Sequence, residues 1–243
     1  MKQLLTPIKA VIFDVYGTLL EVGPPVPDAD AWWSRIFREI LGIEPPIDRH
    51  EFFAACKRIT EEMEQAVRRK GILHPEVNWP VVVQKAIPRL AMFQPDVLKH
   101  FATELIRLQH TSWVRPETAY VLGNLHQKGY VLGIASNSQA YTLHELRTGL
   151  APYGLSLEIF EPTLCFFSYE YGFKKPDPYV FRIISVRLEA RGINPYETVM
   201  VGDQIEKDIL PARDVGWQTW LLCGGSEEIQ AGDWPRFTKW LGL

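Results

Sequence analysis

The fold of this chain is decided by residues 8–19, which read IKAVIFDVYGTL. The first six residues are rich in β-branched and apolar side chains on both faces, which is typical of a buried strand in a parallel sheet. Asp14 follows directly, and Gly17 supplies a turn after it. This stretch therefore predicts a buried strand that presents a carboxylate at its carboxyl end.

The rest of the chain alternates between strand-like and helix-like patterns. Three later segments share the apolar pattern of the first strand: residues 130–135, 198–201 and 217–222. Apolar side chains recur at helical spacing over residues 116–128 and 178–191, and a glycine follows each of these two stretches. Such alternation predicts an α/β fold with a Rossmann-like parallel sheet core and right-handed crossovers.

Residues 22–111 carry no convincing strand pattern and are rich in helix signals instead. Helix starts are marked by Asp28, by the capping-box pair Asp48 and Glu51, and by the proline-containing segments at Asn78 and Pro95. A helical insertion after the first strand predicts a cap over the sheet. We therefore expect an α/β core of residues 1–21 and 112–243 and an inserted helical cap domain of residues 22–111.

The composition is that of a globular protein, since 47% of the 243 residues are hydrophobic and 23% are charged. The formal net charge is −3, and acidic and basic residues are interspersed without a long basic run. A basic surface is what nucleic acids and anionic membranes attract. We therefore expect neither of them as the main partner.

Two further features bear on location. The three cysteines, Cys56, Cys165 and Cys223, are odd in number, far apart and without C-x-x-C spacing. We interpret them as reduced structural thiols, with a reactive thiol as the alternative. The first apolar run ends at Asp14, so we expect no signal peptide or membrane span there. Together these features indicate a cytoplasmic protein.

Four polar segments follow predicted strands, and in open α/β sheets ligands bind beyond the carboxyl ends of the strands. The first contains Asp14. A carboxylate at a strand end can act as a nucleophile and form an aspartyl-phosphate or an ester. The alternative is a strand that simply ends in a turn, where Asp and Gly are common.

The second and third segments could bind the group that Asp14 attacks. Ser136 and Asn137 could donate hydrogen bonds to a phosphoryl or carboxylate oxygen, and the alternative is that they cap the following helix. Lys175 could neutralise Asp14 and an incoming anion. We interpret Lys174 as a solvated neighbour, and Asp177 as the cap of the next helix.

The fourth segment contains two carboxylates, Asp203 and Asp208, on either side of a strand-to-helix turn. Together with Asp14 they would form an oxygen-rich pocket of the kind that holds Mg²⁺. Without a cation, clustered carboxylates repel one another and one tends to take up a proton. The alternative is that Asp208 caps the next helix.

These four segments, in this order, resemble the four motifs of the haloacid dehalogenase superfamily of hydrolases, and the insertion is similar to its helical, C1-type cap. The resemblance implies a small-molecule substrate and three catalytic residues: Asp14 as the nucleophile, Ser136 as the group that holds the transferred moiety, and Lys175 as the balancing charge. It implies Mg²⁺ as the cofactor, with ligands or supporting groups from Asp14, the Tyr16 backbone carbonyl, Asp203 and Asp208. We expect Thr18, Asn137 and Tyr16 to contribute to substrate binding.

The sequence departs from this resemblance at Tyr16. Phosphatases of the superfamily usually carry a second Asp at this position, which protonates the leaving group. A phenol with an ordinary pKa near 10 is a poor base at neutral pH, and general acid–base help is typically worth ~10²–10⁴-fold.

The Asp-x-Tyr-Gly-Thr pattern around Tyr16 resembles the superfamily's L-2-haloacid dehalogenases instead. Those enzymes need no metal and lack the Gly-Asp-x-x-x-x-Asp form that contains Asp203 and Asp208. They also use a cap arginine for the anion, whereas we interpret Arg35 and Arg38 as surface residues of an amphipathic helix.

Three functional hypotheses follow. The first is a Mg²⁺-dependent phosphohydrolase that acts on a small phosphorylated metabolite through an aspartyl-phosphate at Asp14. The second is an enzyme similar to L-2-haloacid dehalogenases, which displaces a halide through an Asp14 ester. The third is a catalytically weak relative that binds a phosphorylated ligand or a partner protein.

Overall fold

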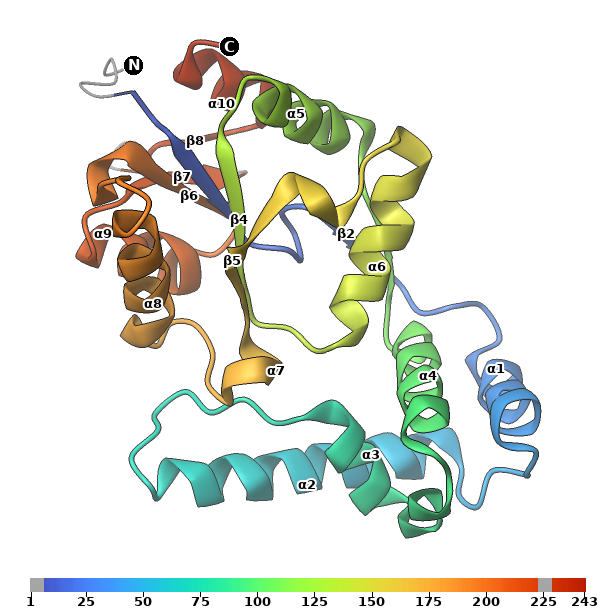
Figure 1. Cartoon of the computed structure of the whole chain (residues 1–243). Coiled ribbons are helices and arrows are strands. Elements are labelled where there is room, and N and C mark those ends of the chain that lie inside the picture. The colour runs from blue at the N-terminus through green and yellow to red at the C-terminus, as the bar shows by residue number, and fades with distance from the viewer. Residues whose placement is uncertain (1–6, 223–228) are drawn as a thin grey trace.

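The computed structural model describes residues 7–222 and 229–243, and a six-stranded parallel sheet forms its centre (Figure 1). The strand order is β5-β4-β1-β6-β7-β8, with every neighbouring pair parallel. The strands are β1 (Ala10–Phe13), β4 (Val131–Ser136), β5 (Phe160–Phe167), β6 (Thr198–Gly202), β7 (Gln218–Leu222) and β8 (Ala231–Gly232). The expected α/β, Rossmann-like core is confirmed.

Helices cover both faces of the sheet because its central strands β4, β1, β6 and β7 are apolar on both sides. One face packs against α5 (Pro116–Gln127), α6 (Tyr141–Leu150) and α10 (Trp234–Leu241), and Val11 and Phe13 of β1 point to it. The opposite face packs against α8 (Pro178–Glu189) and α9 (Leu210–Asp214), and Ala10 and Ile12 point there. The two-residue alternation of β1 thus assigns its side chains to two separate apolar clusters.

The segment between β2 (Glu21–Gly23) and β3 (Thr111–Trp113) is helical and has an apolar core of its own. β2 and β3 pair as a short antiparallel ribbon at its base. The helices are α1 (Ala29–Ile36), a π-helix (Phe37–Leu41), α2 (Arg49–Arg68), α3 (Trp79–Ala86), a 3-10 turn (Pro88–Met92), α4 (Pro95–Leu105) and a second 3-10 turn (Ile106–Leu108). Their buried core includes Trp33, Phe37, Phe52 and Phe101.

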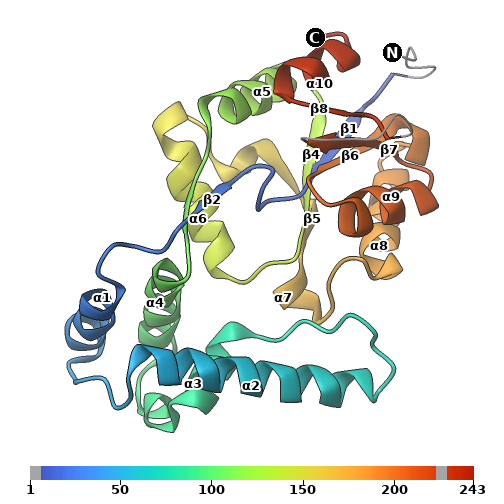
Figure 2. The same cartoon turned by 180° about the vertical axis from the view of Figure 1, so that it is seen from behind.

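The helical insertion lies across one end of the sheet. In both views α2 and α3 extend beneath the end from which α7 (Ser168–Tyr171) projects (Figures 1 and 2). Because α7 follows β5 directly, this is the carboxyl end of the sheet. The insertion therefore covers the edge where the polar segments follow their strands.

Several local expectations for the insertion can now be compared with the structure. The Asp48 carboxylate accepts a hydrogen bond from the Glu51 amide at 2.8 Å, so the predicted helix start at Asp48 is confirmed. Asp28 precedes α1, but it lies in the left-handed region with a φ of 54° and makes no side-chain cap. The β2–β3 ribbon was not expected, and it spans both predicted domain boundaries.

Two elements of the core were not anticipated from sequence. The edge strand β5 carries Pro162 and other exposed side chains in its middle, which interrupts the apolar pattern. The tail contributes α10, whose Trp234, Phe237 and Trp240 belong to the main core cluster. Cys223, assigned above as a structural thiol, lies outside the described residues.

In the described part of the chain, we find no helix whose length and apolar character would allow it to span a membrane.

Removal of one α10 side chain should reveal how strongly this helix stabilises the core. Phe237 is fully buried and contacts the rings of Trp220, Trp234 and Trp240. We expect Phe237→Ala to lower the free energy of unfolding by about 3 kcal/mol, because it leaves a cavity in a packed cluster. Urea denaturation measures this, with the exposed Lys239→Ala as a control expected within about 0.5 kcal/mol of the parent. Equal losses in both variants would contradict a role for α10 in the core.

Candidate active site

The polar residues that follow the strands converge at the carboxyl end of the sheet, because parallel strands end at the same edge. Asp14 directly follows β1, Ser136 ends β4, and Asp203 directly follows β6. Lys175 comes from the loop between α7 and α8, and Asp208 comes from the π-helical turn Ile205–Ile209. Four of these five side chains belong to buried residues, and Asp203 is half-buried.

The Lys175 ammonium group joins two of the carboxylates. Its Nζ lies 2.7 Å from Asp14 Oδ1 and 2.5 Å from Asp208 Oδ1. Burial lowers the pKa of Lys175, but the Asp14 and Asp208 carboxylates outweigh it and hold the pKa above its ordinary value. Lys175 is therefore a fixed positive charge beside the nucleophile candidate.

One lysine does not neutralise three carboxylates. Asp14, Asp203 and Asp208 each offer an oxygen that lies within 4.8 Å of the others. Burial, together with the charges of Asp208 and Asp203, raises the pKa of Asp14 to about 6 despite Lys175, and burial with Asp208 also raises the pKa of Asp203. The cluster has the oxygen donors and the excess negative charge that a hard divalent cation such as Mg²⁺ requires.

Two glycines allow the carboxylates to approach the backbone this closely. A Cβ on Gly17, which has a φ of 81°, would lie 2.4 Å from Asp203 Oδ2. A Cβ on Gly202 would lie 2.4 Å from Asp208 Oδ2, and the same carboxylate oxygen accepts the Gln204 amide at 3.0 Å. The acidic cluster therefore depends on residues without side chains on two different loops.

Three buried polar atoms around this cluster have no protein partner. They are Thr18 Oγ1, Ser136 Oγ and Asp203 Oδ1. Buried polar groups are almost always hydrogen-bonded, since an unpaired one costs about 1–3 kcal/mol. Unpaired polar atoms at or just after the ends of β1, β4 and β6 are what a site for a polar ligand at this edge of the sheet requires.

Asn137 and Ser136 do not cap a helix. The α6 helix begins at Tyr141, and no side chain caps its N-terminus. The Asn137 side chain accepts the Lys175 amide at 2.7 Å and donates to the Lys175 carbonyl at 2.9 Å. Asn137 thus holds the Lys175 backbone, and its role in substrate binding stays a prediction.

Asp208 does not cap a helix either, because it lies within the π-helical turn. Asp177 caps α8 as expected, since its carboxylate accepts the Tyr179 amide at 3.0 Å. Lys174 is not merely solvated: its Nζ lies 2.8 Å from Glu64 Oε1 of α2, in the insertion. The expectation for Lys174 was wrong because its partner lies 110 residues away.

Tyr16 directs its hydroxyl to α6. The Tyr16 hydroxyl lies 2.5 Å from Glu145 Oε2 and 2.8 Å from Thr142 Oγ1, both on α6. Burial and the Glu145 charge raise the pKa of Tyr16 well above its ordinary value. The phenol is therefore a neutral group engaged with α6, and contacts between Tyr16 and a substrate stay a prediction.

The insertion is tied to the core directly above this site. Gln139, in the loop before α6, donates to the Val77 carbonyl at 2.7 Å and accepts the Trp79 amide at 2.9 Å. The Ser168 hydroxyl donates to Glu76 Oε2 at 2.8 Å. These contacts hold the segment between α2 and α3 over the carboxyl end of the sheet.

Comparison with known proteins agrees with this geometry. The family model described as haloacid dehalogenase-like hydrolase matches residues 8–216. The chain belongs to this family. The matched residues run from the first strand to the loop that precedes β7, and they include all four predicted motifs.

Similar proteins include both phosphatases and dehalogenases. An uncharacterized hydrolase of Schizosaccharomyces pombe is 28% identical to this chain, and the match covers 86% of this chain and 88% of the S. pombe protein. A glyceraldehyde 3-phosphate phosphatase of Methanopyrus kandleri is 27% identical, and the match covers 87% of this chain and 82% of the M. kandleri protein. Among solved structures, a HAD phosphatase from Thermococcus onnurineus (TM-score 0.59, 22% identity) and a 2-haloacid dehalogenase from Pseudomonas syringae pv. tomato (TM-score 0.60, 20% identity) each cover 97% of this chain and 98% of their own. The two structures show the fold alone.

Sequence reasoning missed the residues that connect the hydrolase core to its insertion. Glu76, Gln139, Glu145 and Ser168 are polar residues of helices or loops and belong to none of the four motifs. Only their contacts with distant segments distinguish them, and Glu145 contacts a residue 129 positions away. The one available sequence signal was Tyr16, because a tyrosine stands where the phosphatases of the superfamily usually have an aspartate.

Removal of the Asp14 charge should stabilise the cation-free protein. The pKa of Asp14 is about 6 in the folded state, above its ordinary value of 3.8, so the folded state loses stability as pH rises from about 4 to 6. We expect Asp14→Asn to raise the free energy of unfolding at pH 7 by about 2 kcal/mol and to have little effect near pH 4. Urea denaturation in the presence of chelator measures both values. The exposed Asp214→Asn serves as the control, and an effect of Asp14→Asn that is independent of pH would contradict this account.

Proposed function

We propose that this hydrolase is a Mg²⁺-dependent phosphohydrolase that acts on a small phosphorylated metabolite, with residues 22–111 as a C1-type cap. The observation that carries the proposal is the set of unpaired polar atoms beside the cluster of Asp14, Asp203 and Asp208. Three carboxylates with one lysine need a cation, and buried hydroxyls need a ligand with acceptor oxygens. A phosphoryl group bound with Mg²⁺ satisfies both requirements.

We assign the Mg²⁺ ligands to Asp14, Asp203 and the Tyr16 backbone carbonyl, with Asp208 as a supporting carboxylate. Bound Mg²⁺ would neutralise negative charge on the phosphoryl oxygens and on the carboxylates. Asp208 accepts hydrogen bonds from Lys175 and from the Gln204 amide, which fixes its orientation.

The nucleophile in this proposal is Asp14. Its carboxylate oxygen attacks phosphorus, the bond between phosphorus and the leaving oxygen breaks, and an aspartyl-phosphate forms. Lys175, 2.7 Å from Asp14, balances the charge of the phosphoryl oxygens, and the Ser136 and Thr18 hydroxyls donate to those oxygens. Water then cleaves the aspartyl-phosphate and restores the carboxylate.

Tyr16 restricts the leaving group. Its hydroxyl is engaged with Glu145 and Thr142, so it does not deliver a proton toward Asp14. We therefore expect the enzyme to favour substrates whose leaving group departs without protonation, such as an aryloxide or a carboxylate. The similarity of this chain to a glyceraldehyde 3-phosphate phosphatase supports the hydrolysis of phosphate esters in general.

Dehalogenation is the second candidate, because a halide needs no proton and Tyr16 provides none. The residues of the insertion offer little support for it. Arg35 pairs with Glu39 at 3.9 Å and Arg38 with Glu44 at 3.2 Å, and the side chains of both arginines are at least half exposed. Asp203 also has no role in a reaction without a metal, whereas Asp208 would still pair with Lys175.

Location and partners complete the proposal. The thiols of Cys56 and Cys165 are free, and burial raises the pKa of both to about 12, which indicates structural thiols with little reactivity. We propose a cytoplasmic enzyme with a small-molecule substrate, as the sequence predicts.

The first experiment compares p-nitrophenyl phosphate with L-2-chloropropionate, each with Mg²⁺ and with chelator. We expect release of nitrophenol that chelator abolishes, and no chloride release. Asp14→Asn should abolish turnover, because Asp14 supplies the attacking oxygen in this proposal. Chloride release that chelator leaves unchanged would assign the enzyme to dehalogenation, and no turnover of either compound, with phosphate binding retained, would favour the catalytically weak relative.

The second experiment restores a proton donor at position 16. We expect Tyr16→Asp to hydrolyse an alkyl phosphate such as glyceraldehyde 3-phosphate about tenfold or more faster than Tyr16→Asn, since both variants lose the phenol and a general acid is typically worth ~10²–10⁴-fold. The gain should be smaller with p-nitrophenyl phosphate, whose leaving group is already good. Tyr16→Asn, which removes the phenol without supplying an acid, is the matched control. Equal activity of the Asp and Asn variants would contradict the proposed restriction.

A further inference from the structure

Glu145 of α6 is a half-buried residue outside the four motifs, and its carboxylate contacts two distant segments. Its side chain is 9% exposed. Oε2 accepts the Tyr16 hydroxyl at 2.5 Å, while Oε1 accepts the Ser112 hydroxyl at 2.7 Å and lies 3.1 Å from His110 Nε2. Burial raises the pKa of Glu145, but the hydrogen bonds from His110, Tyr16 and Ser112 outweigh it and leave the pKa below its ordinary value. Glu145 is therefore a satisfied anion that orders its three donors.

Each donor belongs to a segment that matters for the site. Tyr16 lies two residues after Asp14, in the turn where the Gly17 amide donates to Leu20 and the Leu20 amide to Val15. Ser112 lies in β3, one of the two strands that connect the insertion to the core, and His110 directly precedes that strand. The His110 ring also contacts the Tyr16 ring edge-on, with centroids 5.6 Å apart. One carboxylate thus links the turn after Asp14 to the β2–β3 ribbon at the base of the insertion.

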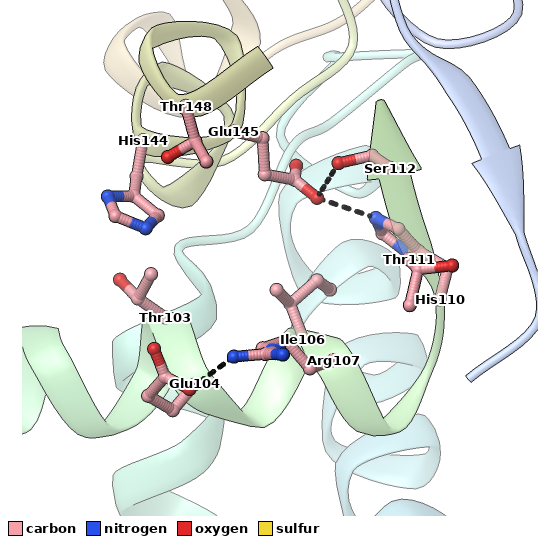
Figure 3. Close-up of a pocket in the computed structure, with 10 residues that line it drawn as sticks. All are labelled: Thr103, Glu104, Ile106, Arg107, His110, Thr111, Ser112, His144, Glu145 and Thr148. Atoms are coloured by element: carbon pink, nitrogen blue, oxygen red, sulfur yellow. Dashed lines mark hydrogen bonds and ion pairs between the residues drawn. The ribbon is translucent and has the colours of Figure 1, made fainter. Parts of the chain in front are cut away.

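A cavity beside Glu145 makes this link important. Its volume is about 260 Å³, and it lies between α6 on one side and α4 with the following 3-10 turn on the other (Figure 3). Glu145, Ser112 and His110 line one part of it, and the ion pair of Glu104 with Arg107 lines another (Figure 3). Helices separated by such a space are incompletely packed against each other. The hydrogen bonds of Glu145 join α6 to the His110–Ser112 segment at the edge of this space.

We propose that Glu145 is a positioning residue that couples the nucleophile turn, through Tyr16, to the hinge strand that carries the insertion, through Ser112 and His110. A movement of the insertion is then transmitted to the backbone beside Asp14. Asp14 is held in its productive position only when the hinge is in the arrangement seen here. The kinetic part of this inference rests on the proposed phosphohydrolase function, whereas the structural part does not.

Hydrogen exchange tests the coupling without any substrate. We expect Glu145→Gln, which weakens the charge-assisted bonds, to accelerate amide exchange in two distant places, namely at Gly17, Leu19 and Leu20 and along the β2–β3 ribbon. Glu104→Gln is the matched control, because Glu104 lines the same cavity, loses the same charge and has no bond to Glu145. Faster exchange confined to α6 would overturn the proposal and leave Glu145 a local stabilising residue.

Kinetics with p-nitrophenyl phosphate test the consequence for the nucleophile. We expect Glu145→Gln and Tyr16→Phe each to lower kcat by about tenfold or more with little change in KM, since a small misplacement of reacting groups is costly. The double variant should lose no more than either single variant, because both remove the same link. Glu104→Gln should retain the parent kcat. Additive losses, or a folded Glu145→Gln protein with the parent kcat, would overturn the proposal.

The two experiments separate this inference from the proposed function. If no phosphate ester is hydrolysed but exchange rises at both distant segments in Glu145→Gln, the proposed function fails and the coupling stands. If p-nitrophenyl phosphate is hydrolysed and neither readout responds to Glu145→Gln, the function stands and the coupling fails.

Discussion

The ion pair of the Lys175 ammonium with the carboxylates of Asp14 and Asp208 is the constraint on which the rest of the site depends. A lysine this deeply buried requires compensation, and two carboxylates at hydrogen-bonding distance supply it. Asn137 holds the Lys175 backbone from β4, so the lysine is fixed from two directions. Three carboxylates around a single ammonium leave an excess of negative charge, which is why the site is suited to a cation.

The sheet and the insertion have different tasks in this architecture. The parallel sheet brings the ends of β1, β4 and β6 together and thereby fixes the chemical groups. The insertion has a separate apolar core, and polar side chains contact the segments after β5, as Glu64 does with Lys174 and Glu76 with Ser168. Polar contacts of this kind can open and re-form at lower cost than a continuous apolar interface.

The sequence was sufficient for the elements whose signal is local. The strand ending at Asp14 and the helix after Asp177 could be predicted because apolar periodicity and end residues determine them. The strand β5 was missed because exposed residues around Pro162 interrupt its pattern, and α10 because its apolar residues follow a glycine-rich segment that resembles a tail. The partnership of Tyr16 with Glu145 is a matter of tertiary contact across 129 positions, which no local pattern encodes.

The central place of β1 has a consequence for synthesis of the chain. Ala10 pairs with Val131 on one side and with Thr198 on the other, so β1 leaves the ribosome well before both of its partner strands. The helical insertion makes mostly local contacts and can collapse around its own aromatic core in the meantime. Until β4 and β6 have been translated, β1 presents apolar side chains on both faces with no sheet to join. The nascent chain is therefore most in need of a chaperone during that interval.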